Sequence, residues 1–116
     1  MMDYCWKQDA INHAEQCDPE ESCGIIGIIN NKEKYFPCKN IPNEIKTESF
    51  VIDPLDYADV EDEVDEIVGI VHSHPQDILE FSETDLYSCK AIDLTFYLVS
   101  PKSDNIKVIN PDEIDA

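Results

Sequence analysis

The sequence predicts a single α/β domain, residues 1–116, in which helices flank a mixed β-sheet. The chain has 116 residues, enough for one compact core and too few for two. Apolar residues make up 42% of it, and the charged residues are interspersed, which is typical of a folded chain. Helix-like and strand-like segments alternate along its length without an internal repeat, as in layered α/β folds.

The first half of the chain predicts one helix followed by short strands. From Asp3 to Cys17 the less polar side chains recur at helical spacing, which indicates a helix with one buried stripe. The run CGIIGIIN, residues 23–30, is apolar and rich in β-branched side chains, so we expect a central strand buried on both faces. KYFP, residues 34–37, and SFVID, residues 49–53, are further strand candidates that end at prolines. The helical stripe consists of Trp6, Ala10, Ala14 and Cys17.

The second half predicts two helices and three strands. Asp53 followed by Pro54 has the form of an N-cap with proline in the first turn, and predicts a short acidic helix through residues 55–66. Ser82 is the expected N-cap of a second helix. The expected elements are strand 66–74, stopped by Pro75, helix 83–92, strands 94–100 and 105–109, and an exposed tail over 110–116.

The charge balance limits the classes of partner. Eight basic residues against 26 acidic ones give a net charge of −18. Such a surface repels phosphate, which argues against nucleic acid and anionic membranes and favours a protein or peptide partner. Acidity that serves only solubility is the alternative interpretation.

The lack of a recognisable targeting signal and the pattern of cysteines favour a cytoplasmic protein. The longest apolar run, GIIGII, has the length of a strand and not the roughly 20 residues of a membrane-spanning helix. The N-terminus MMDYCWKQDA lacks the basic and apolar regions of a secretory signal. The five cysteines include no CxxC pair, so we expect free thiols in a reducing compartment.

Two of the three histidines stand together in the segment VHSHPQDILEFSETD, residues 71–85. On a strand, His72 and His74 project to the same face while Ser73 points away. Asp85, in the first turn of the following helix, can face back over the strand end. Two imidazoles and one carboxylate, with a fourth position open to water, have the form of a catalytic zinc site. Ser82 and Asp85 are also interpretable as a plain helix-capping pair.

This segment resembles the JAMM (MPN+) metalloprotease motif, which consists of an upstream glutamate and then His-x-His, seven residues, Ser, two residues and Asp. His72, His74, Ser82 and Asp85 match that spacing without a mismatch. In the family the glutamate precedes a buried strand that begins with a small residue and glycine, and EESCGIIGI has that form. The resemblance implies the cytidine-deaminase-like JAMM/MPN fold.

The resemblance also implies a role for each residue. His72, His74 and Asp85 would hold Zn²⁺, which lowers the pKa of a bound water from 15.7 toward about 7. Glu21 would act as the base that accepts a proton from this water. Ser82 would donate its hydroxyl to the oxyanion that forms during amide hydrolysis.

Three neighbouring residues have alternative interpretations. Glu20 is the rival of Glu21, but the family pattern places glutamate two residues before Cys-Gly, and in an extended chain the two side chains point to opposite sides. Cys23 shares the face of Glu21, and we expect a small buried core residue and not a ligand. His13 has no motif partner and is expected on the surface of the first helix.

A longer resemblance, over roughly residues 5–101, is to the JAMM portion of phage tail assembly proteins of the lambda protein K type. In those relatives an NlpC-type cysteine peptidase domain commonly follows, so this chain is either one domain of such a protein or a shorter relative. We therefore expect a zinc metallopeptidase that acts on a peptide or isopeptide bond in phage tail assembly, with tail components as partners, in the host cytoplasm. The alternatives are an isopeptidase for ubiquitin-like or sulfur-carrier conjugates, and a non-catalytic assembly module with the same fold.

Overall fold

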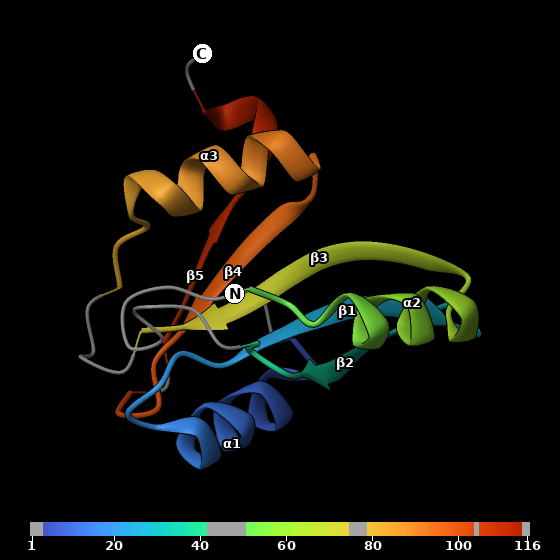
Figure 1. Ribbon diagram of the computed structural model, residues 1–116, viewed down its shortest axis with the longest axis horizontal. Coiled ribbons are helices and arrows are strands. Elements are labelled where there is room, and N and C mark those ends of the chain that lie inside the picture. The colour runs from blue at the N-terminus through green and yellow to red at the C-terminus, as the bar shows by residue number, and fades with distance from the viewer. Residues whose placement is uncertain (1–3, 42–50, 75–78, 104, 115–116) are drawn as a thin grey trace.

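The structure of the protein is a computed structural model that describes residues 4–41, 51–74, 79–103 and 105–114. These residues form one five-stranded sheet in the order β2-β1-β3-β4-β5, and only the β3–β4 pair is parallel. Figure 1 shows the sheet between α1 on one side and α3 on the other. The elements in chain order are α1 (Lys7–Cys17), β1 (Cys23–Ile29), β2 (Lys32–Cys38), α2 (Pro54–Glu63), β3 (Glu66–Ser73), α3 (Glu83–Ile92), β4 (Thr95–Val99), β5 (Ile106–Ile109) and the 3-10 helix η1 (Pro111–Glu113).

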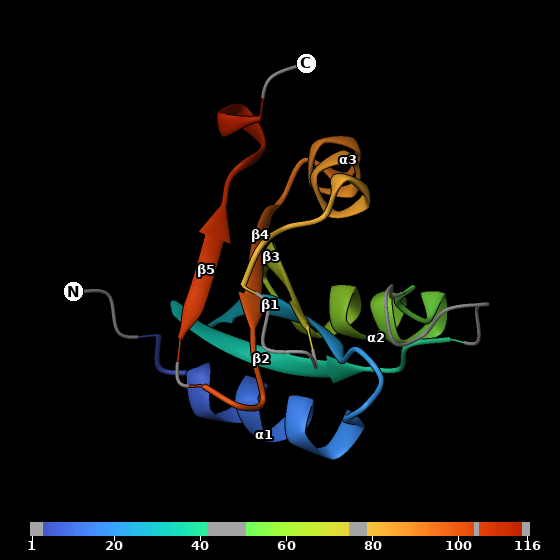
Figure 2. The ribbon, with the colours of Figure 1, turned by 90° about the vertical axis from the view of Figure 1, so that its left-hand side faces the viewer.

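Two buried clusters lie on the two faces of the sheet. On one face the apolar side of α1 packs against β1, β3 and β4, and Trp6 stacks edge-on against Tyr97 with ring centroids 4.9 Å apart. On the other face α2 and α3 cover a second cluster that includes Ile25, Ile70 and Phe96. Figure 2 shows α1 on one side of the sheet and the two other helices on the opposite side. The fold is therefore a three-layer α/β arrangement, as the sequence predicts.

The apolar strand is interior and mostly buried, as predicted, but it is not the middle strand of the sheet. Cys23–Ile29 forms β1, an interior strand, but the middle position belongs to β3. The reason is a tight hairpin, because Asn30 and Asn31 adopt positive φ angles of 53° and 65°, which suit a two-residue turn. This turn folds β2 back along β1 and makes β2 the edge strand.

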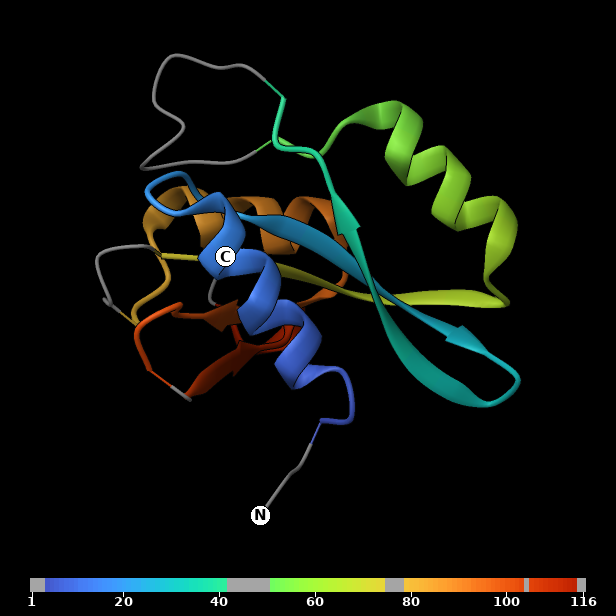
Figure 3. The ribbon, with the colours of Figure 1, turned by 90° about the horizontal axis from the view of Figure 1, so that it is seen from below.

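The first helix is shorter than its predicted range. It begins at Lys7, and Trp6, Ala10 and Ala14 of the predicted stripe are buried while Cys17 is half-buried. Ile11 is buried as well, which widens the apolar side of the helix. Figure 3 shows α1 crossing the sheet on this side.

The second helix ends three residues before the end of its predicted range. Asp53 accepts the Leu55 N–H at 2.9 Å and Pro54 occupies the first position, so the predicted start is confirmed. Val64 leaves the helix in an extended conformation and packs where β1 has Gly27, since a Cβ on Gly27 would lie 2.5 Å from Val64 Cγ1. This contact ends α2 at Glu63 and lets β3 begin at Glu66.

Two other segments differ from their predictions. Of the strand expected over 49–53, the described part contributes only an isolated bridge between Ile52 and Asn40. Within the expected tail 110–116, the described residues include η1, and Ile114 packs against the second buried cluster. Lys90 Nζ donates to Ile114 O at 2.9 Å, so α3 holds this segment in place. Most of the predicted loop after His74, residues 75–78, lies outside the described residues.

Candidate metal centre and adjoining cleft

Pairing between β1 and β3 brings residues distant in sequence to one end of the sheet. Cys23 lies opposite His72 in this antiparallel pair. One step further, Ser73 N donates to Ser22 O at 3.1 Å, and Ser22 N donates to Ser73 Oγ at 2.8 Å. The same register sets Glu21 opposite His74. The strand pairing, and not the chain sequence, therefore decides that Glu21 lies beside the two histidines.

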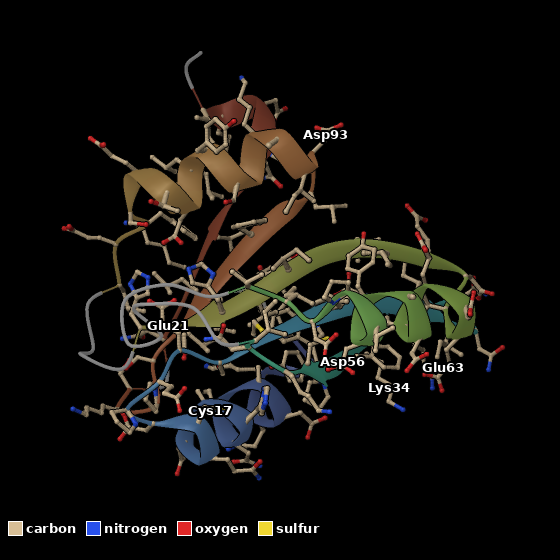
Figure 4. The ribbon with its side chains drawn as sticks, in the orientation of Figure 1. Cys17, Glu21, Lys34, Asp56, Glu63 and Asp93 are labelled. Carbon is tan, nitrogen blue, oxygen red and sulfur yellow. The ribbon has the colours of Figure 1, made fainter. Side chains whose placement is uncertain are left out.

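The side chains of Glu21, His72 and His74 converge on one point. One ligand-capable atom of each lies within 4.8 Å of the others. Glu21 and His72 are buried, at 2% and 0% exposure, and His74 is half-buried. Ser73 lies between the histidines and points to the other face, where it hydrogen-bonds to Ser22 just before β1, as the alternation of strand side chains requires. Figure 4 shows Glu21 at this end of the sheet, close to the end of α1 that carries Cys17.

The start of α3 completes the cluster. Ser82 is the N-cap, as predicted: its Oγ accepts the Asp85 N–H at 3.0 Å, and Asp85 Oδ2 accepts the Ser82 N–H at 2.9 Å. The same Oδ2 atom lies 3.2 Å from His72 Nε2 and 3.3 Å from His74 Nε2. Ser82 and Asp85 are thus a capping pair, and Asp85 also faces both histidines.

These distances fit a bound tetrahedral cation. Two ligand atoms at about 2.0–2.1 Å from one tetrahedral zinc lie about 3.3 Å apart. The two distances from Asp85 to the histidines have this value. Glu21 supplies a further carboxylate, one oxygen of which lies within 4.8 Å of a ring nitrogen of each histidine.

The protonation of these groups agrees with metal binding. Burial lowers the pKa of His72, which keeps its imidazole neutral, the form that coordinates a cation. Burial alone would raise the pKa of Asp85, but the contacts with His72 and His74 outweigh burial and hold this pKa well below its usual range. Asp85 is therefore a carboxylate at neutral pH. The rings of Phe81 and Phe96 pack near His72, with centroids 6.0 Å away, and shield the site from solvent.

Cys23 lies on the same face as the histidines, but its thiol stays protonated, unlike the carboxyl group of Asp85. Its side chain is fully buried, and burial, aided by the neighbouring Cys38 thiol, raises its pKa well above the usual range of a thiol. A thiol coordinates metals as the thiolate, so a protonated Cys23 is a poor ligand. This agrees with the expectation of a small buried core residue.

A cleft of about 570 Å³ opens beside the candidate metal centre. Glu20 and Glu21 line it from the segment before β1, His13 and Cys17 line it from α1, and Asn40 lines it from the segment after β2. Glu20, the rival of Glu21, is only half-buried. This volume lies in the range of small-molecule binding sites.

Sequence reasoning missed three residues around this site. Ser73 hydrogen-bonds to Ser22, next to Glu21, and its place between two histidines that point to the opposite face could have indicated this contact. Asn40 Nδ2 donates to Glu21 O at 3.0 Å, and no sequence pattern predicts this contact. His13 was expected on the helix surface, but it is half-buried, and its Nδ1 lies 2.6 Å from Tyr35 Oη.

Comparison with known proteins defines the class to which this fold and site belong. The chain belongs to the family of prokaryotic homologs of the JAB domain, whose model matches residues 6–110. It is 39% identical over 99 residues to the tail tip assembly protein K of Escherichia phage N15. The match covers 85% of this chain and 40% of the phage protein, so the chain spans less than half the length of that relative.

Solved structures agree on the fold. A protein from Desulfitobacterium hafniense superposes with a TM-score of 0.67 at 21% identity, covering 87% of this chain and 75% of that one. A JAB1/MPN domain protein from Archaeoglobus fulgidus superposes with a TM-score of 0.62 at 17% identity, covering 91% and 84%. The predicted JAMM/MPN-type fold is therefore confirmed. Among the helices of the described residues, none has the length and apolar character needed to cross a bilayer.

Proposed function

We propose that this protein is a zinc-dependent metallopeptidase of the JAMM type, which hydrolyses a peptide or isopeptide bond during phage tail assembly. The observation that carries the proposal is the position of Asp85 Oδ2, which lies 3.2 and 3.3 Å from the Nε2 atoms of two histidines at the end of β3. The relative in phage N15, a tail tip assembly protein, supports the biological setting.

In this proposal His72, His74 and Asp85 hold the zinc, and Glu21 is the proton carrier. Bound zinc supplies a Lewis acid and a water that is acidic enough to ionise near neutral pH. Asp85 is the preferred ligand because it is a carboxylate that faces both histidines, while Glu21 has a cleft beside it for substrate. The Glu21 carboxylate accepts a proton from the attacking water and delivers it to the leaving amine.

Ser82 is the proposed donor to the developing oxyanion. Its Oγ accepts the Asp85 N–H, which leaves the hydroxyl hydrogen available to the carbonyl oxygen of a substrate. Removing such a donor costs about 10²–10³ in rate in other enzymes. The cap orients the hydroxyl and the Asp85 carboxylate together, because one turn of helix holds both.

The experiment compares three carboxylate variants. Glu21→Gln should keep zinc and lower turnover at least about 100-fold, because only the base is removed. Asp85→Asn should lower zinc content and turnover together, and the matched control Glu20→Gln should change neither. Purified tail proteins and isopeptide-linked conjugates would be incubated with each variant, zinc would be measured by elemental analysis, and products by mass spectrometry.

Each outcome decides between classes of function. Loss of turnover in Glu20→Gln but not in Glu21→Gln would move the base to Glu20. Cleavage only of conjugates linked through a C-terminal glycine would favour the isopeptidase. Zinc-loaded protein that cleaves none of these substrates would favour the non-catalytic assembly module.

A further inference from the structure

The third histidine, His13, lies at the junction of two clefts. It lines the cleft of about 570 Å³ that also contains Glu21. It also lines a second cleft of about 320 Å³ between α1 and β2, where Tyr35 and Pro37 form the opposite wall. Gln16, one turn further along α1, borders both clefts as well. The clefts therefore follow one seam between α1 and the edge strand β2, and His13 stands at the point where they meet.

A buried tyrosine fixes the orientation of the His13 imidazole. His13 Nδ1 hydrogen-bonds with Tyr35 Oη at 2.6 Å, and Tyr35 is almost fully buried. Tyr35 Oη also donates to Cys23 O at 3.4 Å, which fastens the tyrosine to the first residue of β1. A Cβ on Gly24 would collide with the Tyr35 ring, so glycine at this position is what admits the tyrosine. The ring of His13 is thus placed by a buried partner and not by solvent.

The second nitrogen of His13 remains for a ligand. Burial lowers the pKa of His13, so the imidazole is neutral near pH 7. With Nδ1 engaged by Tyr35, Nε2 is the other polar atom of the ring, and it has no hydrogen-bond partner among the described residues. A neutral, oriented imidazole in a cleft exchanges hydrogen bonds with amide groups without the cost of burying a charge.

We propose that His13 is a substrate-binding residue, whose Nε2 hydrogen-bonds with the backbone of an extended peptide lying along the α1–β2 seam. This inference rests on the proposed function, and it specifies the substrate as a polypeptide segment with several free backbone amides next to the bond that is cut. The contact belongs to substrate binding and not to the metal or the base, because His13 lies on α1 and outside the cluster of Glu21, His72 and His74.

Two hydroxamate probes test the inference by binding and not by turnover. Acetohydroxamate carries the zinc-binding group alone, and trialanine hydroxamate adds a peptide backbone. Both would be titrated into the zinc-loaded full chain by calorimetry. His13→Ala should weaken trialanine hydroxamate by about 5- to 10-fold, the value of one hydrogen bond, and leave acetohydroxamate within about 2-fold. His13→Gln, whose amide also forms hydrogen bonds, should recover part of the loss.

Tyr35→Phe and Glu15→Ala serve as companions. Tyr35→Phe removes only the orienting hydroxyl, and should weaken trialanine hydroxamate by about 2- to 3-fold. Glu15→Ala changes an exposed residue of α1 outside both clefts and should have no effect. If His13→Ala binds trialanine hydroxamate like wild type, or weakens both probes equally, the inference is overturned. If wild type binds neither probe, the proposed metal centre itself fails, and this inference falls with it.

Discussion

Both faces of the sheet carry a buried apolar cluster, but only one of these clusters adjoins the candidate metal centre. On the α1 face the buried cluster is apolar from Trp6 to Val99. On the face of α2 and α3 the apolar cluster gives way, at the end of β3, to two histidines and Asp85. A single strand serves both faces, because Val71 points to one and His72 to the other. The difference shows that alternate side chains of β3 have different roles. Those on one face pack in the apolar core, and those on the other face lead to the candidate metal centre.

The largest expected effect is on the α1 face. Trp6 is buried at 2% exposure and stacks on both Tyr4 and Tyr97. Trp6→Ala should lower the free energy of unfolding by about 3–5 kcal/mol, the usual cost of removing a buried aromatic ring. Zinc bound per folded chain should not change, because no proposed ligand lies on this face. Urea unfolding and elemental analysis measure the two quantities; a loss below about 1 kcal/mol would contradict the assignment of this face to stability.

Removal of the metal should lower the melting temperature without unfolding the two apolar clusters. Zinc at 100 to 1,000 times its Kd stabilises a folded chain by about 2.7–4.1 kcal/mol, and chelation removes this contribution. The melting temperature should fall, while circular dichroism at 25 °C persists because both apolar clusters remain intact. The His72→Ala plus His74→Ala variant should melt like chelated wild type and should not respond to the chelator. Complete loss of the dichroism signal on chelation would show that the metal centre, and not the core, holds the fold.

Ser73 should affect both the stability of the fold and the position of Glu21 in the candidate metal centre. Its Oγ accepts the buried Ser22 N–H at 2.8 Å, next to Glu21. Ser73→Ala leaves this N–H without its acceptor and should cost about 1–3 kcal/mol of stability. It should also lower turnover more than zinc content, since Glu21 loses its fixed position while both histidines stay. Ser73→Thr keeps an oxygen and should behave like wild type; equal losses in both variants would point to a packing effect instead.

A further expected effect, which is absent at neutral pH, is a decline of stability at alkaline pH. Burial raises the pKa of Cys38 and Tyr97 to about 12, and it raises the pKa of Cys23 well above the usual range of a thiol. A folded-state pKa above the unfolded value contributes stability that is complete below the unfolded pKa and is lost as pH rises toward the folded pKa. For the two thiols this decline should begin near pH 9.

Urea midpoints at pH 8, 9, 10 and 11 measure this decline. Cys38→Ala should make it shallower, because one of the titrating thiols is gone. Cys5→Ala is the matched control, since Cys5 is exposed and should leave the slope unchanged. A wild-type midpoint that stays constant up to pH 11 would contradict the prediction.

Local chemistry explains which features could be predicted. The Asp53–Pro54 and Ser82–Asp85 helix starts depend on side chains that reach neighbouring N–H groups within one turn, and both lie where the sequence places them. The convergence of His72 and His74 depends only on strand alternation, which is equally local. The end of α2 could not be predicted, because Val64 leaves the helix to pack in the space that Gly27 leaves open on a strand far away in sequence.

By itself the sequence determined the α/β class, the helix starts and the pair of histidines, since each follows from contacts among near neighbours. Only the tertiary structure decided that Glu21 lies beside these histidines, because the Ser22–Ser73 contact that brings them together joins residues 51 positions apart. It likewise decided that β3 and not β1 is the middle strand, and that His13 faces Tyr35 across 22 positions. Strand order and register depend on which surfaces bury each other, and that competition involves the whole chain at once.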